Sequence, residues 1–229
     1  LHRAAVGGAD LVVGVAVRLQ HLGRGREHRT ALAVGHGPQG RATASGYVPR
    51  LAGKPADYLF QQLRHFRDGR RSNPEMAHLL QPLSDEFLRE LAAHFAAQQI
   101  PYPAPEPATL APTTLALGRA LVSGDAPGRG IPGCAQCHGR ALTGAEPAVP
   151  GLLGLPRGYL AAQLGAWKSG VRRAAAPDCM AEIAKKLSPE DIAAVSQWLA
   201  AQPLPADTRP APAASLPRPL PLACGSVQP

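Results

Sequence analysis

The sequence predicts an all-α protein of two tandem helical units, and three observations lead to this prediction. Apolar residues recur at the spacing of a helix face, as Leu88, Leu91 and Phe95 do. No segment alternates apolar and polar residues for long enough to predict a sheet. Two long segments also resemble each other at a nearly constant offset, which is typical of a duplicated unit.

The internal repeat extends over most of the chain. The stretch that begins at Val48 reads VPRLAGKPADYLFQQLRHFRDGRR, and the one that begins at Val149 reads VPGLLGLPRGYLAAQLGAWKSGVRR, at an offset of 101. An insertion of three residues then changes the offset to 104, and Met76 falls on Met180. A repeat of this length predicts two domains of one fold.

Capping residues and glycines mark where helices begin and end. Ser188 with Asp191 three residues later is typical of a helix start, and Ser84 stands at the matching place in the first repeat. The stretch TTLALGRALVSGD predicts a helix from about residue 114 to 123, closed by Gly124. Gly118 in its middle would let a second helix cross at short distance.

Proline content and the repeat together set the expected domain boundaries. The stretch IPYPAPEPATLAP alternates proline with small residues, and each proline removes a backbone donor and restricts the residue before it. Eight prolines near the end predict an extended tail, laid over the second domain. The expected division is an atypical N-terminal segment at 1–35, a first domain at 36–98, a Pro-rich linker at 99–113, a second domain at 114–202 and a Pro-rich tail at 203–229.

Charge and hydropathy argue against two classes of function. The formal net charge is +8, but residues 1–50 hold seven arginines against two acids, which leaves +3 for the other 179 residues. Those remaining cations are scattered among acids without an aromatic platform, so we expect no nucleic-acid partner. No apolar run approaches the roughly 18 residues that span a bilayer. The nearest, LVVGVAV at residues 11–17, resembles a signal-peptide core but has no clear cleavage site after it.

The stretch CAQCHG at residues 134–139 carries the clearest chemical signal. Two thiols three residues apart, followed directly by histidine, are the attachment pattern of a c-type haem. Cys134 and Cys137, one helical turn apart, can bond to two vinyl groups on one porphyrin edge, which places His138 beneath the iron. A zinc site or a dithiol redox centre also uses CxxC, but the sequence offers neither a second ligand pair nor a βαβ context. Haem is the favoured interpretation, with zinc or dithiol chemistry as the alternative.

The repeat also predicts a second axial ligand. Met180 lies 42 residues after His138, and Met76 lies 40 residues after His36 of the stretch LAVGHG. A lone methionine ahead of a helix is ordinarily core filler. Its recurrence in both repeats favours a ligand to iron, and thioether sulfur raises the reduction potential of haem.

Three more residues of the second repeat are expected around the porphyrin. Metal-bound histidine usually donates its other ring N–H to a carbonyl or carboxylate, and the loop at Pro150 could present such a carbonyl, although a plain turn explains the loop equally well. Tyr159 and Trp167 stand at helical spacing and would face the porphyrin or an ordinary core.

At these residues the chain resembles the tandem-domain class I cytochromes c, the di-haem cytochrome c-four type of bacterial respiratory chains. The resemblance rests on GIPGCAQCHG, VPGLLG, YLAAQLGAWKSGVRR, Met180 and LSPEDIAAVSQWLAAQ, and it covers residues 114–202 closely and 36–98 nearly as well. It implies one haem c bound to Cys134 and Cys137. It also implies axial ligation by His138 and Met180, with the carbonyl of Pro150 bonded to the histidine.

The resemblance further implies a function in electron transfer. A protein of this type passes single electrons between redox partners of a respiratory chain in the periplasm, and it makes or breaks no substrate bond. We therefore expect an electron-transfer protein and not an enzyme. The alternative with the same haem is a subunit of a larger oxidoreductase, such as a membrane-associated oxidase or dehydrogenase complex.

The first domain departs from the pattern at its attachment site. His36 and Met76 match His138 and Met180, but Leu32 and Gly35 stand where the two cysteines would be, so we interpret this as a vestigial site. Three explanations remain open: a haem-free docking module, a haem bound without covalent bonds, or a reading frame that becomes correct only near HGPQG. A second haem in this domain is not expected.

Two cysteines remain after haem attachment. Cys179 adjoins the proposed ligand Met180, and Cys224 lies in the tail. In the oxidising compartment where c-type haem is attached, leftover thiols are more often bridged than free. A Cys179–Cys224 disulfide would fasten the tail over the methionine segment, and two unrelated thiols are the alternative.

Overall fold

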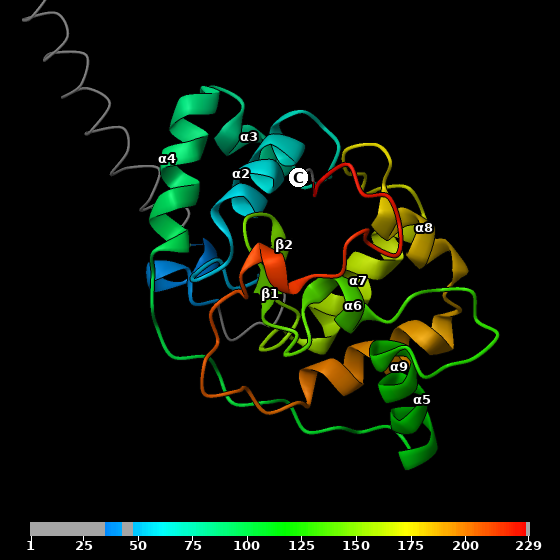
Figure 1. The fold of residues 1–229 in the computed structure, drawn as a ribbon. Coiled ribbons are helices and arrows are strands. Elements are labelled where there is room, and N and C mark those ends of the chain that lie inside the picture. Colours follow the sequence, from blue (N-terminus) through cyan, green and yellow to red (C-terminus); the bar gives the residue numbers. More distant parts are fainter. Residues whose placement is uncertain (1–34, 43–47, 228–229) are drawn as a thin grey trace, which may run out of the picture.

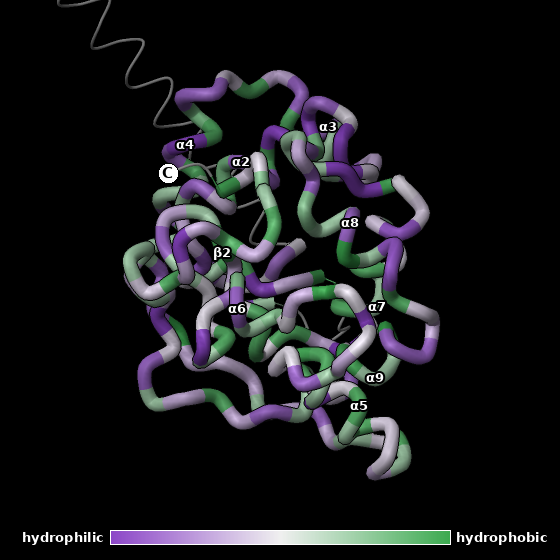
Figure 2. Tube along the Cα trace, turned by 45° about the vertical axis from the view of Figure 1, so that its right-hand side comes forward, coloured by the Kyte–Doolittle hydropathy of each residue, from purple (hydrophilic) through white to green (hydrophobic). Residues whose placement is uncertain are grey.

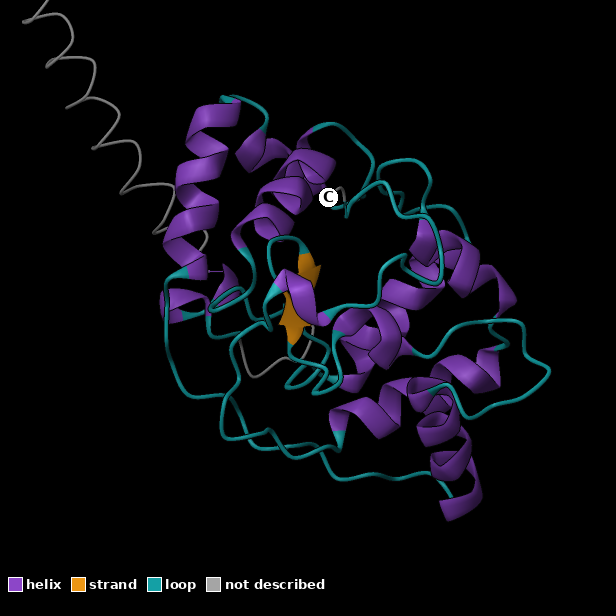
Figure 3. Cartoon of the chain, viewed as in Figure 1, coloured by secondary structure: helices purple, strands orange, loops and turns teal. Residues whose placement is uncertain are grey.

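The computed structural model describes residues 35–42 and 48–227, and the fold is mostly helical (Figures 1 and 3). The first unit contains a short 3-10 helix η1 (Pro38–Gly40), α2 (Ala56–Arg67), α3 (Pro74–Leu80) and α4 (Asp85–Ala96). The second contains α5 (Pro112–Ser123), α6 (Cys134–His138), β1 (Gly144–Ala145), β2 (Val149–Pro150), α7 (Arg157–Lys168), α8 (Cys179–Lys186) and α9 (Pro189–Ala200). A second 3-10 helix, η2 (Ala213–Ser215), lies in the tail.

Matching polar side chains begin matching helices in the two units. Ser84 accepts a hydrogen bond from a backbone N–H of α4, and Ser188 forms a complete capping box with Asp191 at the start of α9. Asn73 caps α3, and Asp178 caps α8. Both methionines of the repeat therefore lie in the first turn of a capped helix, and not in a loop ahead of it as the sequence suggested.

The second unit is built around the crossing of α5 and α9. Leu121 and Val122 of α5 pack with Val195 and Leu199 of α9 in its hydrophobic core. At the crossing, a Cβ added to Gly118 would overlap the carbonyl group of Ala194 in α9. The close crossing predicted from this glycine is confirmed, and the hydrophobic stretches of the two helices lie together in Figure 2.

The first unit has its own core under α2, α3 and α4. Leu63, Leu80, Leu88, Leu91 and Phe95 are buried together there. The apolar face predicted for the helix after Ser84 is the face that this core buries. Nothing in the described residues stands in the place of α5, since residues 1–34 lie outside them.

A short hairpin is the one pair of strands in the described part of the chain, and so the main departure from the all-α class. Strands β1 and β2 pair antiparallel, with Gly144 opposite Pro150 and Ala145 opposite Val149. Each strand has two residues, which is too short for alternation to be visible in a sequence. The all-α prediction is otherwise confirmed.

The two units and the tail contact one another at separate places in the fold. Arg71 and Arg172 form an antiparallel β-bridge between the units. The tail pairs with the hairpin, where Ala211 bridges Ala145, and it also reaches the first unit, where Gln61 donates to the Ser226 carbonyl at 3.1 Å. The expectation that the tail covers the second domain is therefore too narrow, because its end also lies against α2.

Membrane crossing has no support among the described helices. None of those within residues 35–42 and 48–227 is both long and apolar enough to span a bilayer.

The α5–α9 crossing should tolerate no side chain at Gly118. We expect Gly118→Ala to lower the free energy of unfolding by about 1–3 kcal/mol, because the added methyl group overlaps backbone that cannot move aside. Gly165→Ala in α7 is the matched control. No atom lies within 4 Å of its added Cβ, and it should stabilise the helix by about 0.5–1 kcal/mol. Urea unfolding of both variants tests this, and equal effects would contradict it.

Candidate haem site

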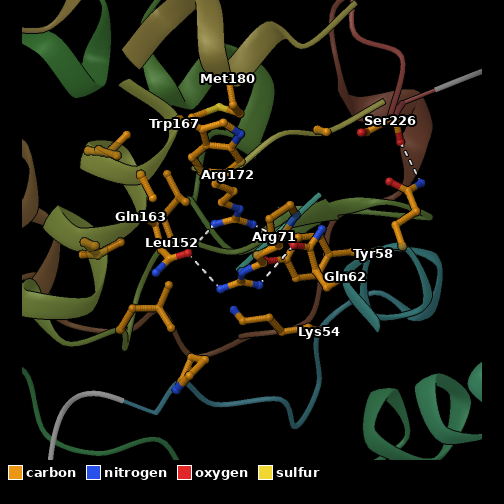
Figure 4. A pocket seen from close by; sticks show the side chains of 18 of the residues that line it. Lys54, Tyr58, Gln62, Arg71, Leu152, Gln163, Trp167, Arg172, Met180 and Ser226 are labelled. Atoms are coloured by element: carbon orange, nitrogen blue, oxygen red, sulfur yellow. Dashed lines mark hydrogen bonds between the residues drawn. The ribbon is translucent and has the colours of Figure 1, made fainter. Parts of the chain in front are cut away.

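A cavity of about 580 Å³ lies between the two units. It reaches from His36 and Met76 in the first unit to His138 and Met180 in the second. Its volume lies within the range of cofactor and ligand sites in proteins. Figure 4 shows Met180 and Trp167 along one side of this cavity.

The short helix α6 directs the CAQCH residues toward the cavity. Cys134 and Cys137 are half-buried, carry free thiols and line the cavity together with His138. Burial raises the pKa of the Cys134 thiol to about 11. A dithiol redox centre uses a thiol of lowered pKa, so this environment does not support the dithiol alternative.

A hydrogen bond to the Pro150 carbonyl fixes the orientation of His138. Its Nδ1 lies 2.8 Å from that oxygen, and because a carbonyl can only accept, Nδ1 must donate. Nε2 is then the ring nitrogen that is free to bind a metal. Burial lowers the pKa of His138, which favours the neutral ring that a metal ligand requires.

Met180 reaches the cavity from the first turn of α8, and contacts of the neighbouring residues hold this turn in place. Asp178 accepts hydrogen bonds from the backbone N–H groups of Ala174 at 2.6 Å and Ala181 at 3.1 Å. The preceding residue, Cys179, forms a disulfide with Cys224 of the tail. The segment that carries the methionine is therefore held to its own helix and to the end of the chain.

The first unit repeats the histidine geometry without the thiols. His36 is buried, and its Nδ1 lies 2.8 Å from the Pro49 carbonyl. Met76 lines the same cavity. Gly35 has no side chain, and Leu32 lies outside the described residues. The structure thus keeps the contact between histidine and proline carbonyl in this unit, whereas the described residues of the unit offer no cysteine to attach a haem.

Buried cations that no sequence pattern had predicted line the interface between the units. Arg71 donates to the Tyr159 hydroxyl at 2.9 Å and to the Gln163 side chain at 2.8 Å, and Arg172 donates to Gln62 at 2.8 Å. Neither arginine forms an ion pair with a carboxylate of the described residues. One sequence feature could have indicated them: Arg71 and Arg172 stand at matching positions of the repeat, at an offset of 101.

Trp167 adds an unsatisfied donor to the same wall of the cavity. Its ring centroid lies 3.7 Å from the Arg172 guanidinium carbon, and Figure 4 shows Trp167 with Met180 on one side and Arg172 on the other. The buried Nε1–H of Trp167 has no acceptor among the described residues. A buried donor without a partner is costly, so an acceptor is expected from whatever fills the cavity.

These features fit a haem group. Its flat apolar ring suits the cavity, its two carboxylates suit the buried arginines and the Trp167 donor, and its vinyl groups suit the two thiols. The zinc alternative fits poorly. Within residues 35–42 and 48–227, no group of three or more His, Cys, Asp or Glu side chains is arranged to hold a metal ion, whereas a structural zinc site needs four ligands.

The repeated helical units and the CAQCH helix together define a two-domain class I c-type cytochrome. No protein-family model matches the chain. Individual relatives do. The chain is 36% identical over 166 residues to cytochrome c4 of Pseudomonas aeruginosa. The aligned region covers 72% of this chain and 80% of that protein. It is also 38% identical over 172 residues to a thiosulfate dehydrogenase electron acceptor of Thiomonas intermedia, and that aligned region covers 74% of this chain and 77% of that protein.

Solved structures agree with these relatives. Reduced recombinant cytochrome c4 from Pseudomonas stutzeri is similar with a TM-score of 0.65 and 28% identity, over 77% of this chain and 97% of that one. The chain belongs to the cytochrome c4 family. A thiosulfate dehydrogenase from Marichromatium purpuratum is also similar, with a TM-score of 0.67 and 34% identity, over 75% of this chain but only 36% of that longer chain.

The disulfide next to Met180 should contribute to stability. It joins residues 45 apart in the sequence, and a loop of that length predicts a loss of about 3–4 kcal/mol in the free energy of unfolding on reduction. Urea unfolding with and without reductant measures the effect. The double variant Cys179→Ser, Cys224→Ser is the control and should not respond to reductant. Two thiols that alkylate in the native oxidised protein would contradict the pairing.

Proposed function

We propose that the chain is a periplasmic electron carrier with one haem attached covalently to Cys134 and Cys137. His138 and Met180 would hold its iron. The hydrogen bond of the His138 ring to the Pro150 carbonyl is the observation that best supports this, because it leaves Nε2 free beside the two thiols. When bound, the haem iron supplies the change of one electron between its ferrous and ferric states.

Each residue of the site then has a separate task. The thiols hold the cofactor, and the Pro150 carbonyl keeps the neutral His138 ring in one tautomer and orientation. Met180 provides thioether sulfur, which favours the reduced iron. Arg71 and Arg172 would bind the carboxylates of the haem at the interface, and the apolar walls of the cavity would exclude water.

In this proposal the first unit carries no covalent haem. The contact of His36 with Pro49 is the remainder of a ligand site whose attachment chemistry is absent from the described residues. The unit still supplies one wall of the cavity, through Lys54, Gln62 and Arg71, and so contributes to the environment of the haem in the other unit.

The relatives support a dehydrogenase as the electron donor. Two of them are named thiosulfate dehydrogenase electron acceptor, and we extend this role to the present chain as a candidate. A second candidate is a haem-bearing subunit or domain of a larger oxidoreductase. It is favoured by the similarity to part of a thiosulfate dehydrogenase chain, of which this chain covers 36%.

The two methionines provide a direct test of the proposed ligands. The purified chain should carry one haem that acid–acetone does not extract, as shown by its pyridine haemochrome spectrum and its mass. Met180→Leu should abolish the charge-transfer band of methionine-ligated ferric haem and lower the reduction potential, because the thioether is lost. Met76→Leu is the matched control and should change neither. Two covalent haems, or equal effects of the two variants, would overturn the proposal.

The donor can be tested with a purified thiosulfate dehydrogenase. Thiosulfate should reduce the oxidised chain only when the enzyme is present, with one electron taken up per covalent haem, measured by stopped-flow absorbance of the haem. Small, weak contacts are typical of redox partners. The chain should therefore be monomeric on its own, and its complex with the dehydrogenase should form and dissociate rapidly. Stable copurification with an oxidoreductase from the native source would instead favour the subunit role.

A further inference from the structure

Lys54 is a buried cation that the first unit places against the haem site of the second. It lies just before α2, and its residue is 6% exposed. Its counterpart in the second repeat is Leu155, which belongs to an apolar core. At this position of the repeat, therefore, only the first unit has a charged residue. The second unit has no charge there that could act on the first.

The lysine contacts the loop that orients the proposed axial histidine. Its Nζ donates to the Gly151 carbonyl at 3.0 Å, across 97 residues of sequence. Gly151 directly follows Pro150, whose own carbonyl accepts from His138. Figure 4 shows Lys54 beside Arg71 among the residues that line the cavity.

No anionic side chain within residues 35–42 and 48–227 neutralises this ammonium group. Lys54 has no ion pair with any carboxylate of the described residues. Burial, and then the charge of Arg50, lower its pKa to about 8, so it is mostly protonated at neutral pH. A charge without a counter-ion in a water-poor site acts over a longer distance than one on the surface.

We propose that Lys54 is a residue of the first unit that raises the reduction potential of the haem in the second unit. This inference rests on the proposed function, because it requires haem at Cys134 and Cys137. A nearby positive charge disfavours the ferric iron, which carries one positive charge more than the ferrous iron. Removing the charge should therefore stabilise the oxidised state.

Arg71 and Arg172 lie at the same interface but are less suited to a test of this kind. Each donates to side chains of both units, so its removal would disturb the packing between them. Within the described residues, the Lys54 ammonium group makes one hydrogen bond, to one carbonyl. Its charge and its hydrogen bond can therefore be separated by three substitutions.

The experiment measures the reduction potential of the holoprotein at neutral pH by spectroelectrochemical titration. Lys54→Met removes the charge and the donor, Lys54→Gln removes the charge but keeps an N–H donor, and Lys54→Arg keeps both. Lys185→Met is the matched control, because Lys185 is exposed and its charge is screened by water and salt. Circular dichroism and the haemochrome spectrum establish that each variant folds and carries haem.

We expect Lys54→Met and Lys54→Gln to shift the redox equilibrium toward ferric haem by about threefold to tenfold, tenfold being 59 mV for one electron. Lys54→Arg and Lys185→Met should leave it nearly unchanged. Equal potentials in all variants, or a normal potential in Lys54→Gln with a low one in Lys54→Met, would overturn the electrostatic role while leaving the proposed function intact. A wild-type chain without covalent haem would overturn both.

Discussion

The hydrogen bond between the His138 ring and the Pro150 carbonyl is the contact on which the rest of the site depends. It selects the ring nitrogen that faces the cavity. It also requires the loop after α6 to bring the Pro150 carbonyl back to within 2.8 Å of the His138 ring. The β1–β2 hairpin provides that return, since Gly144 is paired opposite Pro150. Gly144 has a φ of +90°, and an added Cβ would overlap backbone of β2. A two-residue strand pair, although marginal by itself, is thus enough to fix the orientation of the proposed ligand His138.

The repeat separates the scaffold of the site from its chemistry. Both units present a buried histidine bonded to a proline carbonyl at 2.8 Å and a methionine in the first turn of a capped helix. Only the second has thiols on α6 and a disulfide beside its methionine. Glu75 stands in the first unit where Cys179 stands in the second. The backbone geometry has therefore been kept in a unit whose described residues lack the groups for covalent attachment.

The interface makes the two units depend on each other. Buried arginines are costly to desolvate when their partners are neutral, as all those of Arg71 and Arg172 among the described residues are. The two arginines share the acceptors Gln62 and Gln163 across the interface. Carboxylates of a bound haem would offset that cost and satisfy Trp167 as well. Under the proposed function, cofactor binding and domain association are therefore coupled, and a unit without its own covalent haem still shapes the haem environment of the other.

Local features let the sequence alone determine the fold class, the family and the attachment motif. Helix caps such as Ser84 and Ser188, the close crossing at Gly118 and the spacing of CAQCH act over a few residues, so they can be recognised without the fold. Only the tertiary structure decided which distant groups meet. Lys54 and Gly151, Arg71 and Tyr159, or Gln61 and the tail are separated by 88 to 165 residues. Lysine, arginine and glutamine are ordinarily solvated surface residues, and their burial results from the packing of one unit against the other.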